Sequence, residues 1–146
     1  MQTQQFLVTW IDPQQDKTKC FQIREQVFVK EQGFENEFDE IDETAYHLLI
    51  QAGENPIATA RIFQQDDKWM IGRVCVIPPY RKHGVGRIAV EECEKQIQVL
   101  GGHSSHLSAQ LRIQGFYESM GYHAEGEPYL CLLYTSALSF TADIIM

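Results

Sequence analysis

Strands are predicted wherever apolar residues alternate with polar ones or form short continuous runs. The first such run is residues 6–10, which Asp12 and Pro13 end. Three further runs are separated by turn-forming residues at 53–56 and 66–67, so consecutive antiparallel hairpins are expected. These three predicted strands cover residues 46–52, 57–64 and 68–77.

Helices are predicted where apolar residues recur every three or four positions. Residues 16–29 show this spacing, and so do the residues from Val85 to Leu100, where Gly101 and Gly102 end the pattern. Weaker patterns follow towards the C-terminus. They predict a strand at 107–109, a helix at 111–120 and closing strands at 122–126 and 130–135. The resulting order, β-α-β-β-β-α-β-α-β-β, belongs to the α+β class, and a single domain is expected over residues 1–146.

Composition narrows the class of protein. The net charge of −8 disfavours a general nucleic-acid binder, which needs a basic face. No run approaches the ~18 apolar residues of a membrane helix, so no membrane association is expected. The four cysteines are widely spaced and form no paired motif, which favours reduced thiols in a cytoplasmic protein. An acidic run between Glu31 and Glu43 carries no Lys or Arg and is expected to be an exposed loop.

The main chemical signal lies where the strand ending near Ile77 runs into a glycine-containing loop that opens a helix. Gly84 and Gly86 permit backbone conformations closed to other residues and allow close approach of a ligand. The free N–H groups of a helix start attract phosphate. Arg81, Lys82 and Arg87 add positive charge. The segment therefore predicts a phosphate-binding site.

Two common phosphate-binding motifs fit this segment poorly. A P-loop requires Lys followed by Ser or Thr after its second glycine, whereas Arg87 and Ile88 follow here. A dinucleotide fingerprint requires its first glycine close to the strand, but six residues separate Ile77 from Gly84. The acid expected about 20 residues later is also missing. A nucleotide-binding or interaction protein that uses the same basic loop remains a rival hypothesis.

Three motifs resemble the GNAT superfamily of acetyltransferases. Residues 81–86 match its Arg-x-x-Gly-x-Gly/Ala pyrophosphate loop, and residues 116–122 resemble its Phe-Tyr-x-x-x-Gly-Phe/Tyr signature. Upstream, residues 24–32, residues 39–42 and His47-Leu48 look like a small bacterial subgroup whose substrates are mostly unassigned. The likeness spans about residues 6 to 130.

The resemblance implies an N-acetyltransferase that moves the acetyl group of acetyl-CoA directly to a primary amine of a small molecule or peptide. Acetyl-CoA is then a co-substrate, and no metal is expected. The implied fold is a mixed, mostly antiparallel sheet whose central strands splay apart, with flanking helices. By the same likeness, Tyr117 protonates the departing CoA thiolate and Gln110 contacts CoA. Main-chain groups of Val74, Cys75 and Val76 pair with the pantetheine arm. The implied pyrophosphate loop consists of Arg81, Lys82, His83, Gly84, Val85, Gly86 and Arg87.

Two features depart from the family pattern. Gly72 stands where many relatives carry a glutamate that helps to deprotonate the amine, so the general base stays open. Its candidates are a water chain or one of Glu31, Glu35, Asp39, Asp42 and Ser108. The apolar tail from Cys131 to Met146 also differs, and a homodimer through this tail is one open expectation. Both departures keep a non-catalytic acyl-CoA-binding or sensing module as the alternative function.

Overall fold

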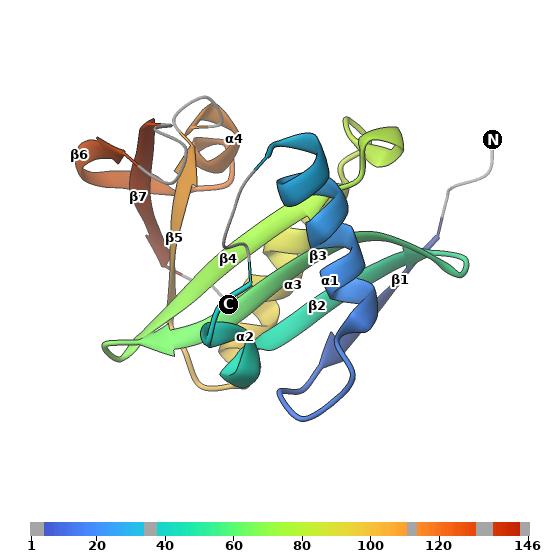
Figure 1. The fold of residues 1–146 in the computed structure, drawn as a ribbon. Coiled ribbons are helices and arrows are strands. Elements are labelled where there is room, and N and C mark those ends of the chain that lie inside the picture. The colour runs from blue at the N-terminus through green and yellow to red at the C-terminus, as the bar shows by residue number, and fades with distance from the viewer. Residues whose placement is uncertain (1–4, 34–37, 111–113, 131–135, 144–146) are drawn as a thin grey trace.

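The computed structural model describes residues 5–33, 38–110, 114–130 and 136–143. Within these residues the chain forms a seven-stranded sheet in the order β1-β2-β3-β4-β5-β7-β6 (Figure 1). The strands are β1 (Phe6–Ile11), β2 (Tyr46–Ala52), β3 (Asn55–Gln65), β4 (Lys68–Val76), β5 (Ser104–Gln110), β6 (His123–Leu130) and β7 (Ser136–Asp143). Neighbouring strands run antiparallel except β4 and β5, which are parallel.

Helices cover both faces of the sheet. α1 and α3 lie on opposite faces of the central strands, and α2 lies where the chain returns to the sheet at the start of β2 (Figure 1). The helical segments are α1 (Thr18–Arg24), the π-helix η1 (Glu25–Glu31), α2 (Ile41–Thr44), the 3₁₀ turn η2 (Pro78–Tyr80), α3 (Val85–Val99) and α4 (Gln114–Glu118). η1 continues α1 directly, so the predicted first helix is one continuous element with a wider second half.

Alternation along β3 separates two packed cores. Ala58, Ala60 and Ile62 are buried with the apolar face of α3. Thr59 and Arg61 alternate with them, and a strand directs successive side chains to opposite faces. The smaller core lies under α1 and consists of Ile11, Cys20, Ile23, Val27, Leu49 and Cys75. Burial of these two apolar sets fixes α1 and α3 against the central strands.

The α+β class and the mostly antiparallel sheet are confirmed, but the acidic run is not an exposed loop throughout, as was predicted. The acidic run contains the short helix α2, and Asp42 within it is buried. Leu130 ends β6, and the rest of the strand predicted at 130–135 lies outside the described residues; β7 was not predicted. β7 inserts between β5 and β6, where Phe140 and Ala142 are buried. Their period-2 spacing is the strand signal that the prediction missed.

Candidate active site

The two parallel strands at the centre of the sheet separate part of the way along their length. β4 pairs with β5 at Met70 with His106 and at Ile71 with Leu107. Beyond those pairs β5 continues against β7, while β4 stays paired with β3 as far as Val76. Figure 1 shows β4 and β5 diverging from this junction. Among the described residues, the edge of β4 after Ile71 therefore has no strand partner on the β5 side.

A bulge marks the point where β4 leaves β5. The register between β3 and β4 shifts between Thr59 and Arg61, so Arg61 lies opposite Gly72. Arg73 adopts φ +54°, which is unusual for a residue with a side chain. Bulges bend a strand and increase its twist. The bulge thus provides a local reason for the divergence of the two parallel strands.

The glycine loop connects the end of β4 to α3. Gly84 caps α3 with φ +80°, and the first helical bond runs from the Ile88 N–H to the Gly84 carbonyl. The N–H groups of Val85, Gly86 and Arg87 precede that bond, so the helix itself supplies no acceptor for them. A Cβ built at Gly84 would meet nothing within 4 Å. The helix start thus leaves consecutive main-chain donors without helical acceptors, at the positive end of the helix dipole.

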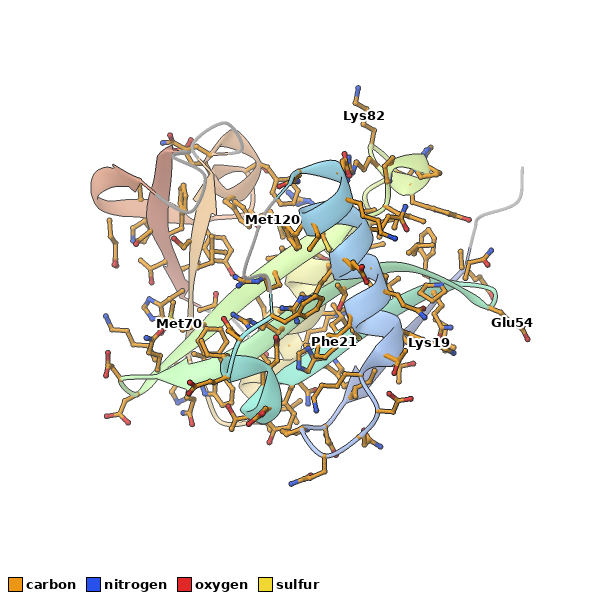
Figure 2. All side chains as sticks on the ribbon, in the orientation of Figure 1. Lys19, Phe21, Glu54, Met70, Lys82 and Met120 are labelled. Atoms are coloured by element: carbon orange, nitrogen blue, oxygen red, sulfur yellow. The ribbon has the colours of Figure 1, made fainter. Side chains whose placement is uncertain are left out.

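Two positive side chains of this loop, Arg81 and Arg87, donate hydrogen bonds to other parts of the chain. Arg81 donates through Nε to the Val76 carbonyl at 2.8 Å and through both terminal nitrogens to Glu31 at 2.6 Å. The Glu31 carboxylate thereby raises the pKa of Arg81 above its usual value. Arg87 donates to the Ser119 carbonyl at 3.2 Å. Lys82 and His83 are exposed, and Lys82 extends outward from the loop (Figure 2). Arg81 therefore anchors the loop to β4 and η1, while Lys82 faces the solvent.

Tyr117 lies buried in the short helix α4. Only 5% of the residue is exposed, and its ring lies 5.0 Å from Phe116 and 5.9 Å from both Tyr122 and Phe140. Burial raises the pKa of Tyr117 far above 10, and the neighbouring Cys93 adds to the effect. The phenol is therefore neutral at physiological pH and able to donate a proton.

The structure places the remaining predicted CoA contact, Gln110, and two of the base candidates, Glu31 and Asp39. Gln110 ends β5 and pairs with Ala137 of β7; its side chain lies outside the description. Glu31 is paired with Arg81. The hydrogen bond from Arg61 lowers the pKa of Asp39. A carboxylate of lowered pKa is a weak base, which argues against Asp39 as the proton acceptor, and Glu31 is already engaged by the Arg81 guanidinium.

Of two further candidates for the general base, Ser108 lies within the described residues and Glu35 does not. Ser108 is exposed on β5, beyond the pairs that join β5 to β4. Glu35 lies outside the described residues. Gly72 is confirmed on β4 opposite Arg61. A water-mediated route and Ser108 therefore remain the base candidates nearest to the open edge.

A buried ion network holds α1, α2 and β3 together beside the open edge. Arg24, fully buried, donates to both oxygens of Asp42 at 2.6 and 3.1 Å. Arg61 donates to Asp42 at 2.8 Å and to both oxygens of Asp39 at 2.6 and 3.1 Å. Burial alone raises the pKa of Asp42, but the bonds from both arginines outweigh it and lower that pKa from 3.8 to about 2. The network explains why the motifs around Arg24, Asp39 and Asp42 occur together in the chain.

Arg61 is the member of the network that the sequence reasoning missed. It stands inside the apolar strand segment Ile57–Phe63, and only 3% of its side chain is exposed. An arginine on an otherwise apolar strand requires buried partners. That exception to the strand pattern was the available signal.

Comparison with known proteins identifies the class to which this fold and site belong. The model of the acetyltransferase (GNAT) family matches residues 10–122. The chain belongs to that family. The relative YjcF, described as an N-acetyltransferase of Bacillus subtilis (strain 168), is 35% identical over 110 residues, which are 74% of this chain and 79% of YjcF.

Solved structures show the same fold. An acyl-CoA N-acyltransferase from Pseudomonas aeruginosa superposes with a TM-score of 0.84 at 24% identity, covering 93% of this chain and 99% of that one. Escherichia coli ElaA gives the same score and identity, covering 94% and 99%. Within the part of our chain that the structure describes, no helix is long and apolar enough to cross a membrane.

Proposed function

We propose that the protein is an N-acetyltransferase that moves the acetyl group of acetyl-CoA to a primary amine of a small molecule or peptide. The observation that carries the proposal is the open edge of β4 leading into the glycine loop. A main-chain edge can pair with the amide groups of a pantetheine arm as an additional strand would. The loop donors then meet the diphosphate, and family membership supplies the acyl-transfer class.

In this proposal most residues of the site hold and orient the substrates rather than react with them. Main-chain groups of Val74, Cys75 and Val76 hold the thioester arm and orient its carbonyl, and any N–H directed at that oxygen stabilises the charge that develops there. The acceptor nitrogen bonds to the carbonyl carbon, and the carbon–sulfur bond breaks. Tyr117 donates its proton to the leaving sulfur, and the amine releases one proton to water or to a base. The buried cysteines Cys20, Cys75 and Cys93 form no disulfide, which suits a reducing cytoplasm.

Calorimetry and a thiol-release assay test this function together. Acetyl-CoA is expected to bind with a measurable heat, and a panel of small amines and peptides is expected to release free CoA thiol. Binding without any thiol release would instead indicate an acyl-CoA-binding module. Equal competition by ATP or NAD would contradict a site built for CoA.

A further inference from the structure

Strand β1 forms one of the two outer edges of the sheet, at the end opposite to β6 (Figure 1). Every residue of β1, from Phe6 to Ile11, pairs with β2, and the register contains no bulge. Within the described part of the chain, no strand pairs with the other side of β1. The main-chain N–H and C=O groups on that side are therefore available to a further strand.

The two outer strands differ in the features that prevent pairing with another chain. β6 contains Glu125, Glu127 and Pro128, and its register against β7 shifts between Glu125 and Tyr129. Charges, proline and bulges on an outer strand all discourage the addition of a further strand. β1, with the sequence FLVTWI, contains no charged residue and no proline. The chain thus protects the β6 edge against pairing and leaves the β1 edge without these features.

Apolar side chains of β1 remain incompletely covered on both faces of the sheet. Leu7 is 57% exposed. Phe6, Val8 and Trp10 pack against the main core but are only partly buried. Because side chains alternate along a strand, these three lie on the face of α3, and Leu7 and Thr9 lie on the other face. A further strand would bury more apolar surface on both faces.

We propose that β1 pairs antiparallel with β1 of a second copy of this chain, so that the two sheets join into one. A two-fold axis at Val8 places Phe6 opposite Trp10 of the partner subunit and Leu7 opposite the partner's Thr9. Facing side chains then lie on the same face of the joined sheet, and aromatic or β-branched pairs of this kind stabilise neighbouring strands. The strand is therefore complementary to itself, which a two-fold interface requires.

The charge distribution favours a second copy over a charged partner. The chain carries a net charge of −8, but residues 6–11 carry none. A charged strand would lose solvation against this apolar edge, whereas two copies that meet along β1 bring no charge into the contact. β7, formed by the tail in which a dimer contact was expected, lies between β5 and β6, so this strand has no free edge for such a contact.

Sedimentation equilibrium at several protein concentrations tests the proposal. The wild type is expected to form a concentration-dependent dimer in the micromolar range. Leu7→Lys combined with Thr9→Lys places lysine opposite lysine, so the dimer dissociation constant is expected to rise about tenfold or more. Both positions are exposed, so the fold is expected to stay. Val99→Lys combined with His103→Lys adds lysines at two other exposed positions, and this control is expected to dimerise as the wild type does.

A charge swap tests the pairing of β1 with itself. Leu7→Glu combined with Thr9→Glu is also expected to be monomeric alone. Mixed with the double lysine variant, it is expected to form a heterodimer, because each lysine then faces a glutamate. A monomeric wild type, a dimer that persists in the double lysine variant, or a mixture without heterodimer would each overturn the proposal.

Hydrogen exchange tests the same contact in the unmodified protein. The amides of β1 are expected to exchange more slowly as the concentration rises through the dimerisation range, while those of β6 stay unchanged. Rates in β1 that do not depend on concentration would overturn the proposal. β2 and β3 lie between β1 and β4, so the double lysine variant is expected to keep its affinity for acetyl-CoA. The outcome is thus independent of the proposed acetyltransferase function.

Discussion

Burial keeps the hydroxyl of Tyr117 protonated at neutral pH, which is the state a general acid requires. A free thiol of pKa near 8.5 receives a proton from an ordinary phenol of pKa near 10 at a cost of about 2 kcal/mol. Because burial raises the pKa of Tyr117 further, the transfer in this site is more uphill. Precise placement of the hydroxyl at the leaving sulfur must offset that cost.

Replacement of Tyr117 tests this role. Tyr117→Phe keeps the buried ring and removes the proton donor, so kcat is expected to fall about 100-fold while the acetyl-CoA dissociation constant changes little. Thiol release measures the first quantity and calorimetry the second. Tyr46→Phe removes a hydroxyl from β2 and serves as the control. A wild-type kcat in Tyr117→Phe would show that another group protonates the thiolate.

Gly84 and Gly86 of the glycine loop differ in how well an alanine can replace them. Gly84 needs its left-handed backbone, so Gly84→Ala carries a strain of about 1–2 kcal/mol and is expected to weaken acetyl-CoA binding roughly tenfold. A Cβ at Gly86 would lie 3.5 Å from the Phe116 ring, an ordinary contact. Gly86→Ala is therefore expected to bind nearly as the wild type does. Calorimetric titration checks both, and the reverse order would contradict the assigned loop geometry.

The helix start at the glycine loop is a local feature, and it was predicted from the sequence. The glycine loop could be recognised because a helix start with free donors is encoded within a few residues, Gly84 and Gly86 among them. The salt bridge between Arg81 and Glu31 could not be predicted, because these residues are far apart in sequence. The salt bridges of Arg61 likewise join distant segments of the chain.

At the scale of elements, the ion network ties the α1–α2 segment to the sheet and makes this attachment sensitive to acid. The pKa of Asp42 is about 2 in the folded protein and near 3.9 when unfolded. A lowered carboxyl pKa stabilises the fold above the unfolded pKa, and the contribution is lost as the pH falls from about 4 towards 2. The shift corresponds to about 2 kcal/mol of unfolding free energy.

Chemical denaturation at several pH values measures this contribution. The wild type is expected to lose stability between pH 5 and pH 2, as acid protonates Asp42. Asp42→Asn is expected to be less stable by about 3–5 kcal/mol at neutral pH, because the buried guanidinium groups of Arg24 and Arg61 lose the Asp42 carboxylate, and its deficit shrinks in acid. Asp66→Asn in the exposed turn after β3 is the control. A deficit that does not change with pH would contradict an ionised, paired Asp42.

Elements with a strong period were predicted correctly, and those set by tertiary contacts were not. β2 was predicted with its observed bounds, because Tyr46–Ala52 carries a continuous apolar signal between clear turn residues. α2 was missed because the charge run around Asp42 favoured an exposed loop, and only the buried arginines make a helix stable there. β7 was not predicted, because its alternation after Ser136 is a weak signal beside the apolar run that precedes it.

At the scale of the whole molecule, an acidic protein must attract an acidic co-substrate. The net charge is −8, and the Glu31 carboxylate accepts a hydrogen bond from Arg81 of the glycine loop. Glu31→Gln removes one negative charge there and weakens the hold on Arg81, so acetyl-CoA affinity is expected to rise by about two- to fivefold at low salt. Glu54→Gln changes the net charge equally in the turn before β3, remote from the loop in Figure 2. Equal effects of the two variants would show that Arg81 does not face the diphosphate.

The separation of β4 from β5 was expected only through the family resemblance, because no local pattern encodes where two parallel strands part. In the structure the separation follows from the bulge at Arg73 and from β7, which keeps β5 on its other side. Both depend on pairing between distant segments. The motifs predicted the kind of protein, and tertiary structure determines the shape of its site.

A crystal structure with acetyl-CoA tests the central claim most directly. We expect the diphosphate on the main-chain donors of Val85, Gly86 and Arg87, and the pantetheine arm paired with β4 from Val74 to Val76. Electron density for the cofactor at any other place, or β5 paired with β4 along its full length, would contradict this account.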